Sequence, residues 1–220
     1  MTDTSKLTRR SILGGLAAAG TALAGCGDDT PTGPDADVTP LNNLLAAEQA
    51  AIKAYDAGRG IVMSAPDTDP QAMFRLVLVA VIERWKAQHE AHAAQLTAQV
   101  RALRGTPVAP DSAGFQAPTG FTPSITNVLI LAANAERGAA VAYNTAMAAL
   151  KRPDSRTLAA SIEGDETQHF AVLSALLNRA VSPGSAIVTG GVNDVVPQAF
   201  VLNAGGMMNG LESVADFTFA

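Results

Sequence analysis

Two pairs of metal-binding side chains, each spaced three residues apart, stand out in this chain of 220 residues. His89 and His92 form one pair, and Glu166 and His169 form the other. Residues three apart share a face of an α-helix, so each pair can direct two ligands to the same point. Imidazole nitrogens and carboxylate oxygens are common ligands of transition metals. The spacing therefore predicts two helices that each contribute a ligand pair to a metal site.

A repeated phrase supplies two further carboxylates. Residues 48–55, EQAAIKAY, are echoed 88 residues later by residues 136–143, ERGAAVAY. Glu48 and Glu136 begin the two copies and lie in apolar runs, where a carboxylate is costly to bury unless it is paired, hydrogen-bonded or bound to a metal. We therefore predict that both glutamates belong to the same site as the two pairs.

Each copy of the phrase ends in a tyrosine, Tyr55 or Tyr143, seven residues after its glutamate. Seven residues are about two helical turns, so each tyrosine shares a face with its glutamate. The tyrosines can donate hydrogen bonds to ligating carboxylates, and packing in the core explains them equally well. We expect them to support the cofactor site without binding the metal directly.

The combined pattern favours a metal site over chance. A lone histidine in a helix is usually a surface or core residue, but all three histidines of the chain fall into this scheme. A duplicated helix pair, with one Glu and one ligand pair in each half, is how a four-helix bundle builds a metal site in its core. The predicted metal ligands are Glu48, His89, His92, Glu136, Glu166 and His169.

Glycine and proline divide the middle of the chain into helices. We expect Gly58 and Gly60 to end the first helix, and short links to join the helices into two antiparallel hairpins. The connection over 105–122 is long enough to cross the bundle. The predicted fold class is all-α, a ferritin-like four-helix bundle of two hairpins joined by a long crossover. Its helices are expected over about 40–57, 71–103, 122–150 and 153–180.

The first 25 residues have the features of an export signal. Arg9 and Arg10 fit a twin-arginine signal, and the apolar stretch after them is too short to span a bilayer comfortably. Residues 23–26, LAGC, match a lipobox and predict lipid attachment at Cys26, the only cysteine. A signal peptide with a chance cysteine is the alternative. We expect a periplasm-facing lipoprotein of the bacterial envelope, bound to the membrane through this lipid.

The segments outside the bundle are expected to be irregular. Residues 26–39, rich in Asp, Pro, Thr and Gly, predict a disordered tether, and residues 181–220 predict an irregular C-terminal tail that packs on the bundle. The bundle itself is assigned to residues 40–180. The net charge of −5 argues against nucleic acid as a partner.

The duplicated helix pair and its ligand pairs resemble the ferritin-like superfamily over roughly residues 40–180, and more narrowly its exported bacterial, desiccation-related members. In that superfamily the first and third helices each give a Glu, and the second and fourth each give a Glu-x-x-His motif. Most of the predicted ligands match this scheme. The exception is His89, which stands where the family has the Glu that helps to bridge two metals.

The resemblance implies one or two transition metal ions, iron or manganese, with zinc possible. It predicts an envelope-located metal-binding protein, with an oxidoreductase acting on ferrous iron or peroxide as the first hypothesis. The small-molecule partner is then an oxidant or a metal ion. The alternatives are metal binding without turnover and a stress-protective structural lipoprotein with a degenerate site. No catalytic residue and no protein partner is assigned.

Among the remaining side chains, Trp85 is expected to be a packing residue rather than a redox relay. Of the two acidic residues just before Glu166, we expect Glu163 rather than Asp165 to approach the edge of the site, because of its spacing on the helix.

Overall fold

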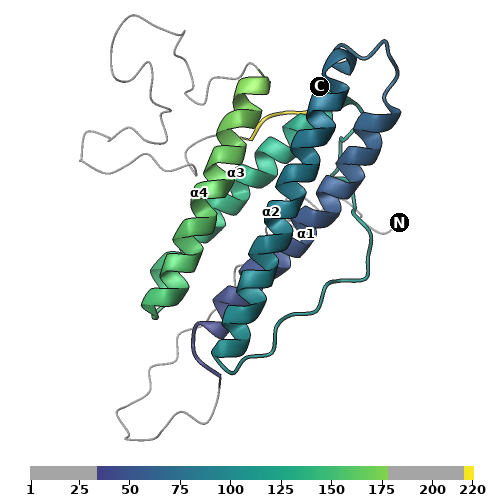
Figure 1. Cartoon of the computed structure of the whole chain (residues 1–220). Helices are drawn as coiled ribbons and strands as arrows, with labels where there is room; N and C mark the ends of the chain where they lie inside the picture. Colours follow the sequence, from purple (N-terminus) through teal and green to yellow (C-terminus); the bar gives the residue numbers. More distant parts are fainter. Residues whose placement is uncertain (1–33, 178–215) are drawn as a thin grey trace, which may run out of the picture.

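The structure is a computed structural model that describes residues 34–177 and 216–220. This part of the chain contains four α-helices and no strand, so the predicted all-α, four-helix fold is confirmed (Figure 1). A short 3-10 helix, η1 (Ala72–Phe74), precedes the second of them. The helices are α1 (Val38–Ser64), α2 (Arg75–Ala102), α3 (Ile125–Ala149) and α4 (Pro153–Leu176).

Several predictions concern residues that lie outside the described part of the chain. These are the signal segment over 1–25, the lipid attachment at Cys26, the first part of the tether and most of the tail over 181–220. Among the helices that the structure does describe, none has both the length and the apolar character needed to cross a membrane.

The helices pack as two hairpins that lie face to face. α1 packs against α2, α3 packs against α4, and α1 also runs along α3. The connection from α2 to α3 follows α1 along the bundle (Figure 1). Near its start, Asn42 donates to the carbonyl of Thr106 and accepts from the amide of Val108, and farther along Lys53 donates to the carbonyl of Ala113. The connection is therefore the predicted crossover.

The first helix is longer than predicted at both ends. It continues through Gly58, which is buried and packs tightly against α3, since a Cβ there would lie only 3.1 Å from Cγ1 of Val128. Gly58 therefore allows close helix packing and does not end the helix. At the other end, buried Asp37 accepts hydrogen bonds from the amides of Lys151 and Arg152. Residues 34–37 are thus held against the bundle, and the predicted tether is too long at its C-terminal end.

Two other helices, in contrast, start later than predicted. α2 begins at Arg75 rather than at residue 71, because residues 72–74 form the tighter 3-10 turn. α3 begins at Ile125, and Ser124 caps it by accepting a hydrogen bond from the amide of Asn127 at 3.1 Å. The cap therefore lies two residues after residue 122, where the helix was expected to begin.

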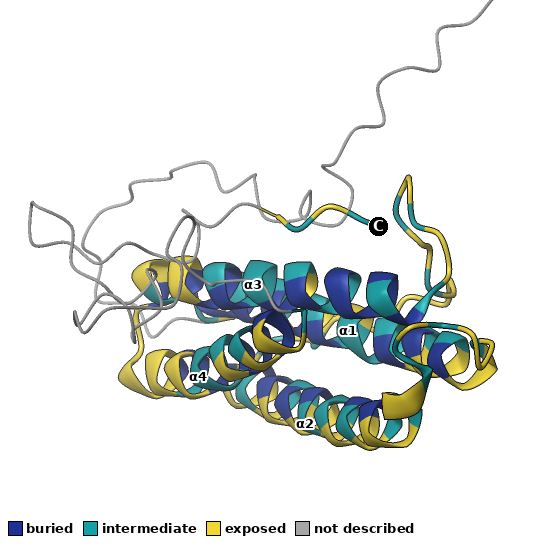
Figure 2. Cartoon of the chain, turned by 90° about the horizontal axis from the view of Figure 1, so that it is seen from above, coloured by how far each residue is buried: buried dark blue, intermediate teal, exposed yellow. Residues whose placement is uncertain are grey.

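The last five residues lie along α3 (Figure 2). The side chain of Asn134 donates to the carbonyl of Phe217 and accepts from its amide, at 2.8 and 2.7 Å. Asn127 makes the same pair of bonds with Ala220. Asparagine side chains thus satisfy backbone amide and carbonyl groups of this segment. The ring of Phe217 also stacks on Phe170 of α4, with centroids 6.1 Å apart.

Apolar side chains fill the bundle above and below a buried polar layer. One apolar cluster includes Leu78, Ile82 and Phe170, and a second includes Leu41 and Leu96. The buried faces of the helices turn toward one another, and the outer faces are exposed (Figure 2). The ionisable side chains between the clusters are therefore shielded from water on both sides.

Candidate metal centre

The structure brings all six predicted metal ligands together in the buried polar layer, although they come from four helices. None of the six is more than 5% exposed. Their ligand atoms form two groups of four, and within each group the atoms lie within 4.8 Å of one another. We call the first group, Glu48, His89, His92 and Glu166, the first half-site. We call the second group, His89, Glu136, Glu166 and His169, the second half-site.

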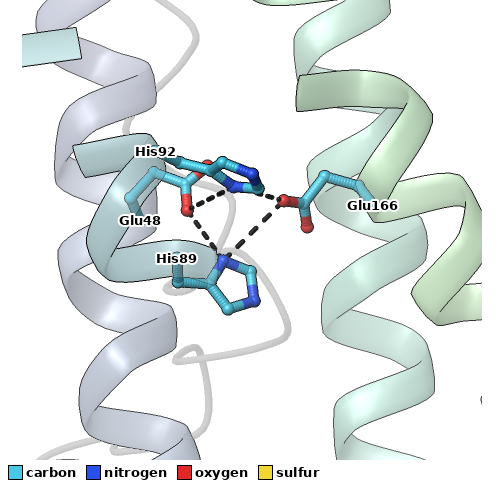
Figure 3. A group of neighbouring side chains, drawn as sticks. All are labelled: Glu48, His89, His92 and Glu166. Atoms are coloured by element: carbon cyan, nitrogen blue, oxygen red, sulfur yellow. Dashed lines mark hydrogen bonds and ion pairs between the residues drawn. The ribbon is translucent and has the colours of Figure 1, made fainter. Parts of the chain in front are cut away.

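The first half-site is built by α1, α2 and α4, whose side chains converge on one point (Figure 3). Oε2 of Glu48 lies 2.7 Å from Nδ1 of His89 and 3.5 Å from Nδ1 of His92. Oε1 of Glu166 lies 3.3 Å from Nδ1 of His92 and 3.7 Å from Nδ1 of His89. Two imidazoles and two carboxylates therefore face one another around a small volume.

The second half-site lies on the other side of the His89 ring. Nε2 of His89 is 3.3 Å from Oε1 of Glu136, and Nδ1 of His169 is 3.1 Å from Oε2 of the same carboxylate. His89 thus turns one ring nitrogen to each half-site, at the position where the family scheme has a glutamate.

The two tyrosines hydrogen-bond to the ligating glutamates, but across the repeat. Tyr143 donates to Oε1 of Glu48, and Tyr55 donates to Oε1 of Glu136. Two turns of helix separate each tyrosine from the glutamate of its own copy, about 10 Å along the axis. α1 and α3 run antiparallel, so each tyrosine lies beside the glutamate of the other copy. The structure therefore gives the tyrosines the role of hydrogen-bond donors to carboxylates, with exchanged partners.

Two residues that orient the histidines were missed in the sequence. Nε2 of His92 lies 3.1 Å from Oδ2 of Asp165, and Nε2 of His169 lies 3.2 Å from Oε1 of Gln88. The expectation that Glu163 rather than Asp165 approaches the site is wrong, since Asp165 contacts His92, while the carboxylate of Glu163 accepts from Thr167 on its own helix. Which side of α4 faces α2 determines whether Glu163 or Asp165 reaches His92. Spacing around Glu166 alone does not reveal that side.

A signal for both missed residues is nevertheless present in the repeat. Gln88 and Asp165 each stand one position before a ligand pair, so they are equivalent in the two halves. Gln88 reaches Nε2 of His169, and Asp165 reaches Nε2 of His92, so each one contacts the last residue of the opposite pair. A partner on the outer nitrogen fixes the ring and its tautomer, so that the inner nitrogen is directed to the metal.

Trp85 packs against the second half-site, as expected of a core residue. Its ring lies 4.5 Å from that of His169, measured between centroids, and meets the ring of Tyr55 edge-on at 6.4 Å. These contacts hold the histidine ring between an aromatic face and Gln88.

Burial and close charges shift the pKa values of the cluster in opposite directions. Burial lowers the pKa of His89, but hydrogen bonds to Glu136 and Glu48 outweigh it and raise the pKa to about 10. Burial also opposes ionisation of Glu48 and Glu136, yet hydrogen bonds from the histidines bring the pKa of both below the usual value. Without a metal, a His89 cation therefore lies between two carboxylate anions.

Glu166 differs from the other carboxylates. Burial, followed by the charge of Glu136, raises its pKa to about 11. Its carboxyl group lies beside that of Glu136. Neither of its buried oxygens, nor Nδ1 of His92, makes a well-directed hydrogen bond within the described residues. Unpartnered buried polar atoms are costly, and a cation between them would bind all three. The nitrogen and oxygen donors of the cluster therefore fit a transition metal ion.

The antiparallel bundle, the long crossover and the buried Glu/His cluster define the ferritin-like class of protein. A family model described as a ferritin-like domain matches residues 36–179. The chain belongs to this family. No curated protein matches the chain in sequence.

Two solved structures share the fold. One is a conserved hypothetical protein from Mycobacterium tuberculosis, with 21% sequence identity and a TM-score of 0.53 over 64% of this chain and 97% of that chain. The other, described as ferritin-like, diiron-carboxylate proteins from Bacillus anthracis str. Ames, has 22% identity and a TM-score of 0.53, over 64% of this chain and 95% of that chain. At these identities the likeness shows the fold alone.

Proposed function

We propose that this protein binds a transition metal ion in the core of its bundle. The observation that carries the proposal is Glu166, a fully buried carboxylate with two unpartnered oxygens, directly beside the inner nitrogens of His89 and His92. Iron, manganese and zinc all suit a mixed set of imidazole and carboxylate ligands. The six ligands and the residues that orient them would then serve to hold the ion in a dry, rigid site.

The cell envelope is the proposed place of action. Arg9, Arg10 and the lipobox at Cys26 support export by the twin-arginine route, followed by lipid attachment, as in exported ferritin-like proteins of the desiccation-related type. Labelling of cells with a fatty acid should mark the wild-type protein in the membrane fraction. The same label should be absent from Cys26→Ser, and equal labelling of both would reject the lipoprotein proposal.

Oxidation of ferrous iron, or reduction of peroxide, is a second candidate function. It is favoured by the two half-sites, which share Glu166 and so offer room for two ions, and by the description of the Bacillus anthracis structure as diiron-carboxylate. A pair of iron or manganese ions would supply the electron exchange with the oxidant. This candidate requires metal-dependent turnover that is lost in Glu136→Ala and His169→Ala.

A third reading is a stress-protective structural lipoprotein whose site no longer binds metal. The buried ligands would then satisfy one another by hydrogen bonds, as Glu136 and His169 do. The unpartnered oxygens of Glu166 argue against this reading for the first half-site.

The test of metal binding has two parts. Untagged protein, purified without a chelator, is measured by elemental mass spectrometry, and its thermal unfolding is recorded with and without a chelator. Bound metal should appear at one or two ions per chain and should raise the unfolding temperature, because it binds only the folded state. The exposed Glu83, paired with Arg59 far from the cluster, gives a control variant in Glu83→Gln. Absence of metal after reconstitution, with no thermal shift, would reject the proposal.

A further inference from the structure

The two half-sites differ in which of their ligand atoms already have hydrogen-bond partners. In the second half-site, Nδ1 of His169 and Oε2 of Glu136 bind each other at 3.1 Å, and Nε2 of His169 is paired with Gln88. The unpartnered buried donor atoms of the cluster are Nδ1 of His92 and both oxygens of Glu166. His92 belongs to the first half-site only, and there its Nδ1 lies 3.3 Å from Oε1 of Glu166, which both half-sites share (Figure 3).

The spacing of these donors indicates a coordination geometry. Zinc bonds of about 2.0–2.2 Å place neighbouring donors about 3.3–3.6 Å apart in a tetrahedron, against about 2.8–3.1 Å in an octahedron with the same bond lengths. Of the four distances between a nitrogen and an oxygen donor in the first half-site, three are 3.3, 3.5 and 3.7 Å. The fourth, 2.7 Å, is the hydrogen bond between His89 and Glu48, which a bound ion would replace. These three nitrogen–oxygen distances are nearer to the edge of the tetrahedron than to that of the octahedron.

His89 explains why the second half-site would not take an ion at the same time. A glutamate at this position can give one oxygen to each of two metals. An imidazole that binds an ion through Nδ1 keeps its proton on Nε2, and here that N–H points to Oε1 of Glu136 at 3.3 Å. Oε1 of Glu136 then accepts hydrogen bonds from both Tyr55 and His89.

We propose that His89 makes this a one-ion centre. Glu48, His89, His92 and Glu166 bind a single four-coordinate divalent cation, for which zinc is the best match, and Glu136 orients His89 instead of binding a second ion. The inference rests on the metal binding proposed above and adds to it the number, geometry and class of the ion. It also favours retention of metal over redox turnover, since zinc does not change its oxidation state.

Cobalt(II) is the probe for this proposal, because tetrahedral Co²⁺ absorbs visible light strongly whereas octahedral Co²⁺ absorbs weakly. The metal-free wild-type protein is titrated with Co²⁺ and followed by its spectrum and by elemental analysis. The expected result is one Co²⁺ per chain with strong absorption, and displacement of that Co²⁺ by one equivalent of Zn²⁺. In His89→Glu we expect weak absorption, up to two ions per chain and a shift of preference from zinc toward manganese and iron.

The repeat supplies a matched pair of variants that assigns the half-site. Glu48→Gln should lose the strong absorption even at saturating Co²⁺, because it removes a ligand, whereas Glu136→Gln should bind one Co²⁺ more weakly, by about 10–100-fold, and keep the strong absorption once saturated. Circular dichroism of both variants verifies that the bundle is folded. Two Co²⁺ per wild-type chain, or weak absorption, would overturn the one-ion proposal and leave metal binding intact. Failure of the wild-type protein to bind Co²⁺ or Zn²⁺ at all would overturn both.

Discussion

Tyr143 on α3 donates a hydrogen bond to Glu48 on α1, 95 residues earlier in the chain. This bond occupies Oε1 of Glu48 and leaves Oε2 facing the two histidines of α2. Tyr55 and Glu136 make the equivalent bond in the other direction. Each half of the repeat therefore orients a carboxylate of the other half, and the two hairpins are joined through the buried polar layer as well as through apolar contacts.

Removal of either tyrosine hydroxyl should destabilise the folded protein. A buried hydrogen bond to a charged group contributes about 1.5–3 kcal/mol, so Tyr143→Phe and Tyr55→Phe should each lower the free energy of unfolding by about that amount. Urea denaturation measures this difference. Thr145→Ala removes an exposed hydroxyl that bonds within its own helix, and should change the free energy by no more than about 0.5 kcal/mol. Equal stability of the phenylalanine variants and the wild type would show that these bonds contribute nothing.

Asp165 should control the affinity for the metal without being a ligand. Its carboxylate fixes the outer nitrogen of His92 at 3.1 Å, which directs the inner nitrogen to the first half-site. Asp165→Asn should reduce the metal affinity by about 10–100-fold, measured by competition with a chelator of known affinity. The matched control is Glu163→Gln, two residues away on the same helix and bonded to Thr167. An unchanged affinity in Asp165→Asn would show that Asp165 does not contribute to metal binding.

Glu166→Gln should separate the stability of the metal-free fold from the binding of metal. The pKa of Glu166 is raised to about 11, first by burial, so the metal-free protein carries an uncharged carboxyl group there that glutamine closely resembles. In a chelator, the variant should unfold within about 1 kcal/mol of the wild type. With metal at a hundred times its dissociation constant, the wild type should gain about 2.7 kcal/mol, whereas the variant should gain much less. A variant that is unfolded in chelator would contradict an uncharged Glu166.

Metal binding should release protons and strengthen as the pH rises. Burial lowers the pKa of His89, but its carboxylate partners raise it to about 10, and the pKa of Glu166 is about 11. Both groups therefore keep their protons between pH 6 and 8 in the metal-free protein. A metal ion binds the deprotonated forms, so each released proton raises the apparent affinity up to about tenfold per pH unit.

Calorimetric titration in buffers with different ionisation enthalpies counts these protons. The expected number is between one and two per ion, and no proton release would contradict the protonated state of His89. The metal-free fold should also lose stability above neutral pH. The stabilisation from His89 is fully present below its unfolded pKa of about 6.5 and is lost as the pH rises through about 10.

The sequence by itself determined the four helices, the crossover and the identity of the predicted ligands. These features depend on local rules. Spacings of three and seven residues fix which side chains share a face, and the length of the 105–122 connection separates a crossover from a short loop. The repeated glutamates and the two ligand pairs predicted a shared metal site, because a duplicated helix pair has few ways to bury its carboxylates.

The tertiary structure alone decided how the helices face one another. The exchange of tyrosine partners follows from the antiparallel course of α1 and α3, and Asp165 rather than Glu163 reaches His92 because of the side that α4 turns to α2. Gly58 continues a helix instead of ending it, since α3 packs against it there. Spacing along one helix fixes directions within that helix, but contacts between helices depend on their relative rotation and register, which only the packed bundle sets.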